Sequence, residues 1–78
     1  MQFRYDPEAD VLFFQFQPEE QTDRARELDG RRYVHERPDG SPVAVELLFV
    51  SEGVDLTDIP RAHEIRACLQ KLDSLALA

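Results

Sequence analysis

The feature that most constrains this chain is a change of hydrophobic period near residue 60. Before that point, apolar side chains recur at every second position, which is typical of strands that bury one face. After Pro60, they recur at steps of three and four, at Ile65, Cys68, Leu69, Leu72, Leu75 and Ala76. This spacing indicates one amphipathic helix. The sequence therefore predicts an α+β fold in which a β-sheet precedes a single helix.

Five segments carry the strand period, and they cover residues 2–5, 11–17, 24–28, 32–37 and 42–50. Turn residues separate them, with Asp-Pro after the first segment and Asp-Gly pairs at 29–30 and 39–40. We expect an antiparallel β-meander of four to five strands over residues 1–50, with 17–23 as a mobile loop. A loop over 51–59 and a helix over about 60–76, packed on one face of the sheet, complete a single domain of residues 1–78.

Composition excludes several classes of protein. The 78 residues hold 9 Lys+Arg against 16 Asp+Glu, so the net charge of -7 disfavours broad binding to phosphate backbones. The hydrophobic fraction of 42% is too high for a disordered acidic tail. No apolar run approaches the roughly 20 residues of a membrane span, and no signal-peptide core is present. The single cysteine, Cys68, excludes an intrachain disulfide and a cysteine-based zinc site. We expect a cytoplasmic protein.

The opening segment Tyr5-Asp6-Pro7-Glu8-Ala9-Asp10-Val11-Leu12 resembles the Y-D-x-E-A-D-x-L signature of a small prokaryotic family, the domain of unknown function 2283. Further along, Asp39-Gly40 and Val45-Glu46-Leu47-Leu48 are similar to that family's hairpin and following strand. The chain departs from the pattern at Phe13, where the family commonly has an aromatic hydroxyl, and at 43–45, where a glycine often precedes the Glu.

The resemblance implies no established activity, cofactor or catalytic residue. It does imply an association, because members of the family are often encoded beside small proteins that look like ribonuclease-type toxins. An antitoxin-like role, with a small basic protein as partner, is the expectation that follows from this analogy.

Candidate catalytic and metal-binding groups are few. Asp6, Glu8 and Asp10 alternate like ligands, but a calcium loop would need a glycine at Val11 and a glutamate at Gln17. A turn in which Asp6 accepts backbone N–H bonds explains the same residues. A metal-dependent enzyme would require these carboxylates and a histidine, His35 or His63, to converge, and Cys68 fits a buried structural thiol. We therefore predict no catalytic, cofactor-binding or metal site and no enzymatic activity.

Positive charge is concentrated in one predicted hairpin. Residues 24–37 contain five arginines against three acids, and these are Arg24, Arg26, Arg31, Arg32 and Arg37. Arginine recognises phosphates and carboxylates, so a nucleic-acid-binding regulator that uses this basic hairpin is the alternative function. The competing interpretation is that the arginines pair with the protein's own acids or with those of a second copy.

Apolar side chains exceed what one helix can cover. Leu12, Phe14, Leu47 and Phe49 share one predicted face, and four more lie opposite, namely Val11, Phe13, Leu48 and Val50. Exposed apolar area in a small domain usually marks an interface, and the strand around Val45 and Leu47 offers an edge as well. The leading hypothesis is a non-catalytic interaction module that self-associates as a homodimer through this face or edge. Acidic surfaces at the amino terminus and at 38–60 would steer a basic partner.

Overall fold

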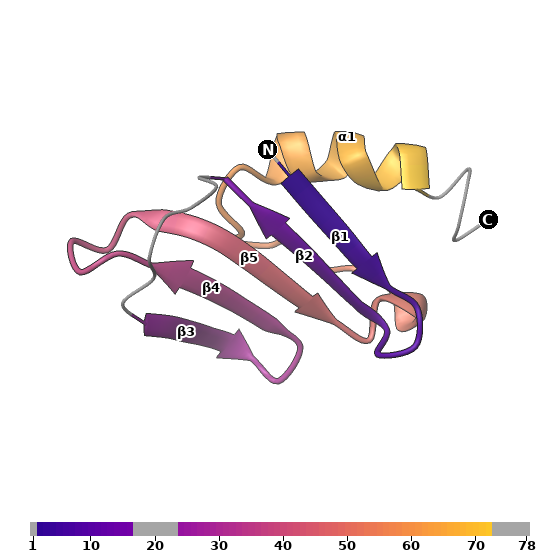
Figure 1. Ribbon diagram of the computed structural model, residues 1–78, viewed down its shortest axis with the longest axis horizontal. Coiled ribbons are helices and arrows are strands. Elements are labelled where there is room, and N and C mark those ends of the chain that lie inside the picture. Colours follow the sequence, from indigo (N-terminus) through magenta and orange to yellow (C-terminus); the bar gives the residue numbers. More distant parts are fainter. Residues whose placement is uncertain (1, 17–23, 73–78) are drawn as a thin grey trace.

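The computed structural model describes residues 2–16 and 24–72, which form five strands and two helical segments. They are β1 (Gln2–Asp6), β2 (Val11–Gln15), β3 (Arg24–Asp29), β4 (Arg32–Glu36), β5 (Pro42–Leu48), the 3-10 helix η1 (Val50–Glu52) and α1 (Ala62–Leu72). Figure 1 shows the strands side by side in one sheet, with α1 along one margin. Within these ranges no helix is long and apolar enough to cross a membrane.

The strands form one antiparallel sheet in the order β1-β2-β5-β4-β3. The predicted α+β fold of an antiparallel sheet and a carboxyl-terminal helix is confirmed. A simple meander would place β3 beside β2, but β5 occupies that position and β3 forms the far edge. The prediction of an exposed edge at Val45 and Leu47 is wrong for the same reason, since β5 pairs on both sides. The physical cause is burial, because the most apolar strand is the one best suited to the centre.

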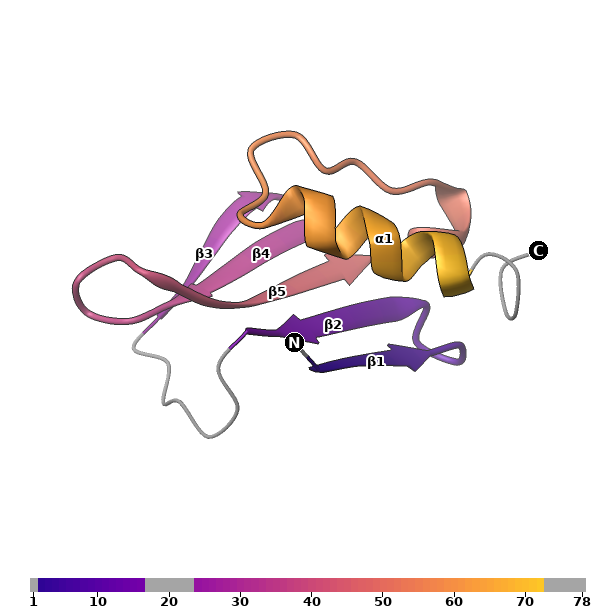
Figure 2. The same cartoon turned by 90° about the horizontal axis from the view of Figure 1, so that it is seen from above.

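The core lies between one face of the sheet and the segment from η1 to α1. Figure 2 shows that this segment and α1 lie on the same side of the sheet. The buried cluster consists of Leu12, Phe14, Phe16, Val34, Val45, Leu47, Val50, Ile59 and Ile65. Cys68 and Leu69 of the predicted apolar stripe pack against it. Positions 73–76 of the predicted helix, and the predicted loop at 17–23, lie outside the described residues.

The helix begins two residues later than predicted. Arg61 has φ 56° and its carbonyl accepts hydrogen bonds from the N–H groups of Glu64 and Ile65. Its guanidinium also contacts both carboxylate oxygens of Glu64. Arg61 therefore occupies the cap position of α1, and the Pro60 ring lies before the first turn.

The β1–β2 turn is stabilised by Asx-type contacts, and the β4–β5 turn depends on a glycine. The Asp6 carboxylate accepts hydrogen bonds from the N–H groups of Glu8 and Ala9, so the predicted turn is confirmed. In the β4–β5 hairpin, only Gly40 of the Asp39-Gly40 pair has positive φ, at 88°. The Gly40 N–H donates to the Arg37 carbonyl and the Arg37 N–H donates to the Ser41 carbonyl. This pattern fits a type I turn followed by a left-handed glycine.

Replacement of Gly40 by alanine should therefore destabilise the fold by about 1 kcal/mol, because a Cβ is strained at positive φ. Gly30→Ala is the matched control, since Gly30 has no such φ and nothing lies within 4 Å of an added Cβ. We expect that control to leave stability unchanged or slightly raised. Urea unfolding of the two variants compares them, and equal free energies of unfolding would contradict the assignment.

Candidate functional site

The sheet face opposite the helix carries a mixed apolar and charged surface, here called the outer face. Among the described residues no helix or connecting segment covers it (Figure 2). Strand alternation and the register place these side chains on it: Arg4 and Asp6 of β1, Val11, Phe13 and Gln15 of β2, Ala44, Glu46 and Leu48 of β5, Tyr33 and His35 of β4, and Ala25 and Glu27 of β3. Val11 pairs with Leu48, and Phe13 follows on the same face, so these three apolar side chains form one patch. Each of them is half-buried.

One line of cross-strand neighbours runs over the whole width of this face. Arg4 pairs with Phe13, Phe13 with Glu46, Glu46 with Tyr33, and Tyr33 with Glu27. We call these five residues the central row. The Arg4 guanidinium lies 5.2 Å from the centroid of the Phe13 ring, and the Tyr33 hydroxyl donates to the Glu27 carboxylate at 3.0 Å. Such a cation–π contact contributes about 0.5–1 kcal/mol at an exposed site.

His35 packs beside the central row. Its ring lies edge-on to Phe13, with centroids 5.7 Å apart, and its Nε2 is 3.3 Å from a carboxylate oxygen of Glu46. Aromatic rings and ionisable groups are therefore interleaved on the outer face. Residues that sequence reasoning did not select, above all Arg4, Glu27 and Glu46, belong to this surface. These residues become neighbours through the register between strands that are distant in sequence. Hydrophobic periodicity does not reveal that register.

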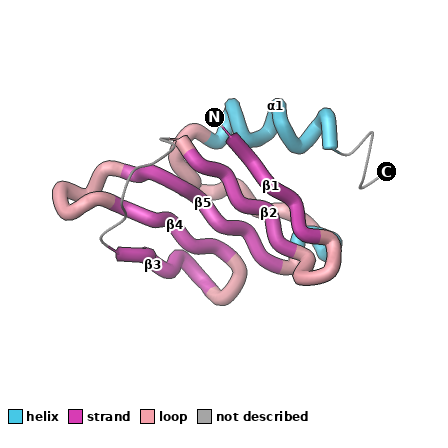
Figure 3. The backbone as a smooth tube through the Cα atoms, in the orientation of Figure 1, coloured by secondary structure: helices cyan, strands magenta, loops and turns pink. Residues whose placement is uncertain are grey.

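Three of the four predicted interface residues come together on the outer face, but Val50 does not. Phe49 has φ 55° and is 45% exposed, while Val50 is 4% exposed and belongs to the core cluster. The left-handed turn at Phe49 ends the strand and reverses the alternation, so Val50 packs inward. Figure 3 shows the resulting η1 turn close to the β1–β2 turn. There the Asp10 carboxylate accepts hydrogen bonds from the Ser51 N–H and hydroxyl.

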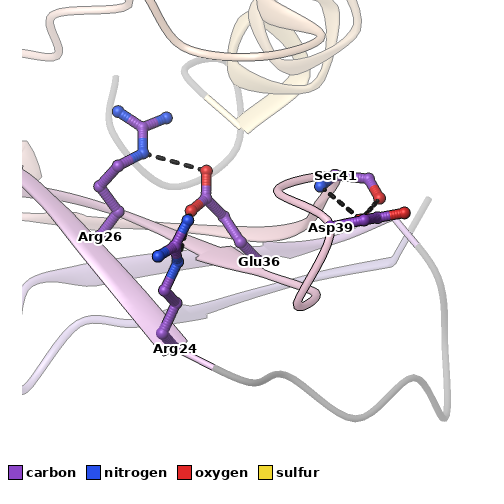
Figure 4. Close-up of polar contacts among 5 residues, drawn as sticks. All are labelled: Arg24, Arg26, Glu36, Asp39 and Ser41. Carbon is purple, nitrogen blue, oxygen red and sulfur yellow. Dashed lines mark hydrogen bonds and ion pairs between the residues drawn. The ribbon is translucent and has the colours of Figure 1, made fainter.

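The predicted basic hairpin is neutralised by the chain's own acids. Arg24 and Arg26 point from β3 toward the same carboxylate, that of Glu36 (Figure 4). Their Nε atoms lie 3.2 and 3.0 Å from its two oxygens. Glu36 is 5% exposed and lies on the helix side of the sheet. A buried carboxylate needs such partners, because an unpaired charge in a dry site is costly.

The remaining arginines of this hairpin are also engaged. Arg31 forms an ion pair with Glu52 at 3.1 Å and lies over the Phe49 ring. Arg32 contacts the carboxylates of Asp29 and Asp55, and it donates to the Thr57 carbonyl as well. Its side chain is 14% exposed, so it ties the segment after η1 to β4. Arg37 has an interaction partner too.

The acidic turn and the histidines do not form a common centre. Asp6 is used in its own turn, and Asp10 binds Ser51. His35 lies on the outer face and His63 is exposed in the first turn of α1. In residues 2–16 and 24–72, no three His, Cys, Asp or Glu side chains are arranged to hold a metal ion.

Two shallow hollows flank the central strands. One, of about 470 Å³, lies at the β1–β2 end of the outer face and is lined by Arg4, Tyr5, Asp6, Pro7, Ala9, Val11, Phe13 and Glu46. The other, of about 360 Å³, lies between the strand ends and the segment after η1. Arg31, Arg32 and their carboxylate partners line that second hollow, so its charges already satisfy one another. The first hollow is lined by apolar side chains and by three residues of the central row, Arg4, Phe13 and Glu46.

Comparison of the chain with family models, with curated proteins and with solved structures finds no match.

The Glu36 cluster makes stability depend on pH. The Arg26 guanidinium, bonded to the carboxylate, holds the pKa of Glu36 below its ordinary value of 4.5; burial opposes this, and Arg24 adds to it. Because the folded pKa is the lower one, the contribution to stability is complete above about pH 4.5 and is lost as the pH falls through the folded pKa.

We therefore expect Glu36→Gln to lower the Tm clearly at pH 7, with the difference from the wild type shrinking as the pH falls below 4.5. Thermal melts followed by circular dichroism between pH 7 and pH 3 measure this. Glu8→Gln, at an exposed turn position, is the control that removes one acid without touching an arginine pair. A constant Tm difference across that range would contradict the role of the ion pairs.

Proposed function

We propose that this chain is a cytoplasmic, non-catalytic interaction module that self-associates through the outer face of its sheet. The proposal rests on one observation: among the described residues, only one face of the sheet is covered by other parts of the chain. The helix and the segment before it bury one face, while Val11, Phe13 and Leu48 lie together on the other. A small domain gains stability when such a surface is covered by another polypeptide.

The size of the outer face supports a reversible association. Five strands about 4.8 Å apart, with about five residues each, cover roughly 400 Å² per copy in projection. Stable interfaces commonly bury about 800 Å² per partner, so this face is smaller than a stable interface and has the size of a weak, transient one. We expect a dimer with a Kd in the micromolar range, which forms and dissociates with concentration.

A nucleic-acid-binding regulator is less well supported than self-association. That function depended on free arginines in residues 24–37, and Arg24, Arg26, Arg31 and Arg32 each have a carboxylate partner within the chain. Their charge is therefore offset before any phosphate approaches. The antitoxin-like role with a small basic partner, which the family resemblance implies, stays a prediction.

Substitution of Phe13 by aspartate should weaken self-association at least tenfold, because it replaces the aromatic ring beside Val11 and Leu48 on the outer face by a charge. Phe3→Asp is the matched control: Phe3 pairs with Phe14 on the opposite face and is 40% exposed. Sedimentation velocity over a concentration series measures both, with circular dichroism to verify folding. A folded Phe13→Asp variant that associates as well as the wild type would overturn the proposed face.

A further inference from the structure

We infer that the occupant of the outer face is a second copy of this chain, related by a two-fold axis that runs along β5. The inference rests on the proposed function and specifies its geometry. It follows from the order of charges in the central row: a cation at the β1 edge, an anion over β5 and a second anion at the β3 edge. These are Arg4, Glu46 and Glu27, with Phe13 and Tyr33 between them.

Among the residues that the structure describes, the charges at the two ends of the row have no ion-pair partner. On the helix side, Arg24 and Arg26 hold Glu36, and elsewhere Arg61 holds Glu64. Arg4, by contrast, lies against the Phe13 ring and has no carboxylate within ion-pair distance in the described part of the chain. Glu27 accepts a hydrogen bond from Tyr33 but has no cation within ion-pair distance among the same residues. Arg4 and Glu27 stand at opposite edges, four strand spacings or about 19 Å apart, so they cannot pair within one copy.

A two-fold axis along β5 brings these ends together between copies. Rotation about that axis reverses the strand order and preserves position along the strands. Arg4 of each copy then faces Glu27 of the other, and Phe13 faces Tyr33. Packed sheets lie about 10 Å apart, and their strands cross at about 30°. This crossing shifts residues at the sheet edges relative to one another, and the long side chains of arginine and glutamate can span the shift.

The competing axis, across the strands, fails on charge. It preserves the strand order, so Arg4 would face Arg4 and Glu27 would face Glu27. Like charges in direct opposition oppose association. Either axis brings Glu46 on the central strand near its counterpart, so this repulsion remains in the favoured arrangement. Glu46→Gln should therefore tighten the dimer at neutral pH.

Charge reversal at the two ends tests the geometry. Arg4→Glu alone and Glu27→Arg alone each replace two attractive contacts by two repulsive ones, and each should raise the dimer Kd roughly tenfold. An equimolar mixture of the two single variants should recover association, because in the mixed dimer every end contact again joins opposite charges. The double variant Arg4→Glu/Glu27→Arg should recover it as well. Equilibrium sedimentation at low salt gives the constants, and Arg66→Glu on α1 is the control for a change of net charge.

The outcomes separate this inference from the proposed function. Recovery in the mixture and in the double variant supports the two-fold arrangement, since a role of either residue in folding would not be rescued by a different chain. Weak association in the mixture, with Phe13→Asp still disrupting the wild-type dimer, overturns the arrangement and leaves the interface in place. A wild type that stays monomeric at every concentration, including one that binds only a basic partner, overturns both.

Discussion

The structure depends on the central position of β5. This strand pairs with β2 on one side and β4 on the other, and it directs Val43, Val45 and Leu47 into the core. The strands β1 and β3 then pair outside β2 and β4. Because β5 is fully paired, the remaining sheet has its exposed edges at β1 and β3, whose residues are mostly polar and exposed. Charged edge strands discourage open-ended pairing, so the proposed association uses the outer face rather than a strand edge.

The two faces of the sheet use charge differently. On the helix side, beyond the apolar cluster, β3 contributes Arg24 and Arg26, and the buried carboxylate of Glu36 holds both. These ion pairs bury the Glu36 side chain on the helix side of the sheet, at a place where no further apolar residue is used. On the outer face, the charges are spread along the central row and are separated by rings. The acidic chain thus stabilises its fold with ion pairs on one side, whereas on the other side Arg4 and Glu27 have no ion-pair partner among the described residues.

The bend at Phe49 links the sheet to the rest of the core. By adopting left-handed geometry it ends β5, exposes its own ring and directs Val50 inward. The Val50 N–H donates to the Asp10 carbonyl at 3.3 Å, so the turn after β1 and the turn after β5 support one another. The chain then returns over the sheet to α1, and Ile59 before the helix and Ile65 within it complete the apolar cluster.

The sequence by itself determined the local structure. The periods of two and then three to four predicted four to five strands and a helix, and Asp6 and Gly40 marked turns, because these signals depend on residues close together in the chain. Tertiary structure decided the strand order, the partners of the arginines, the inward position of Val50 and the alignment of Arg4 with Glu27 across the sheet. Each of these depends on which distant segments pair, and that is settled by burying the most apolar strand at the centre, a property of the whole chain.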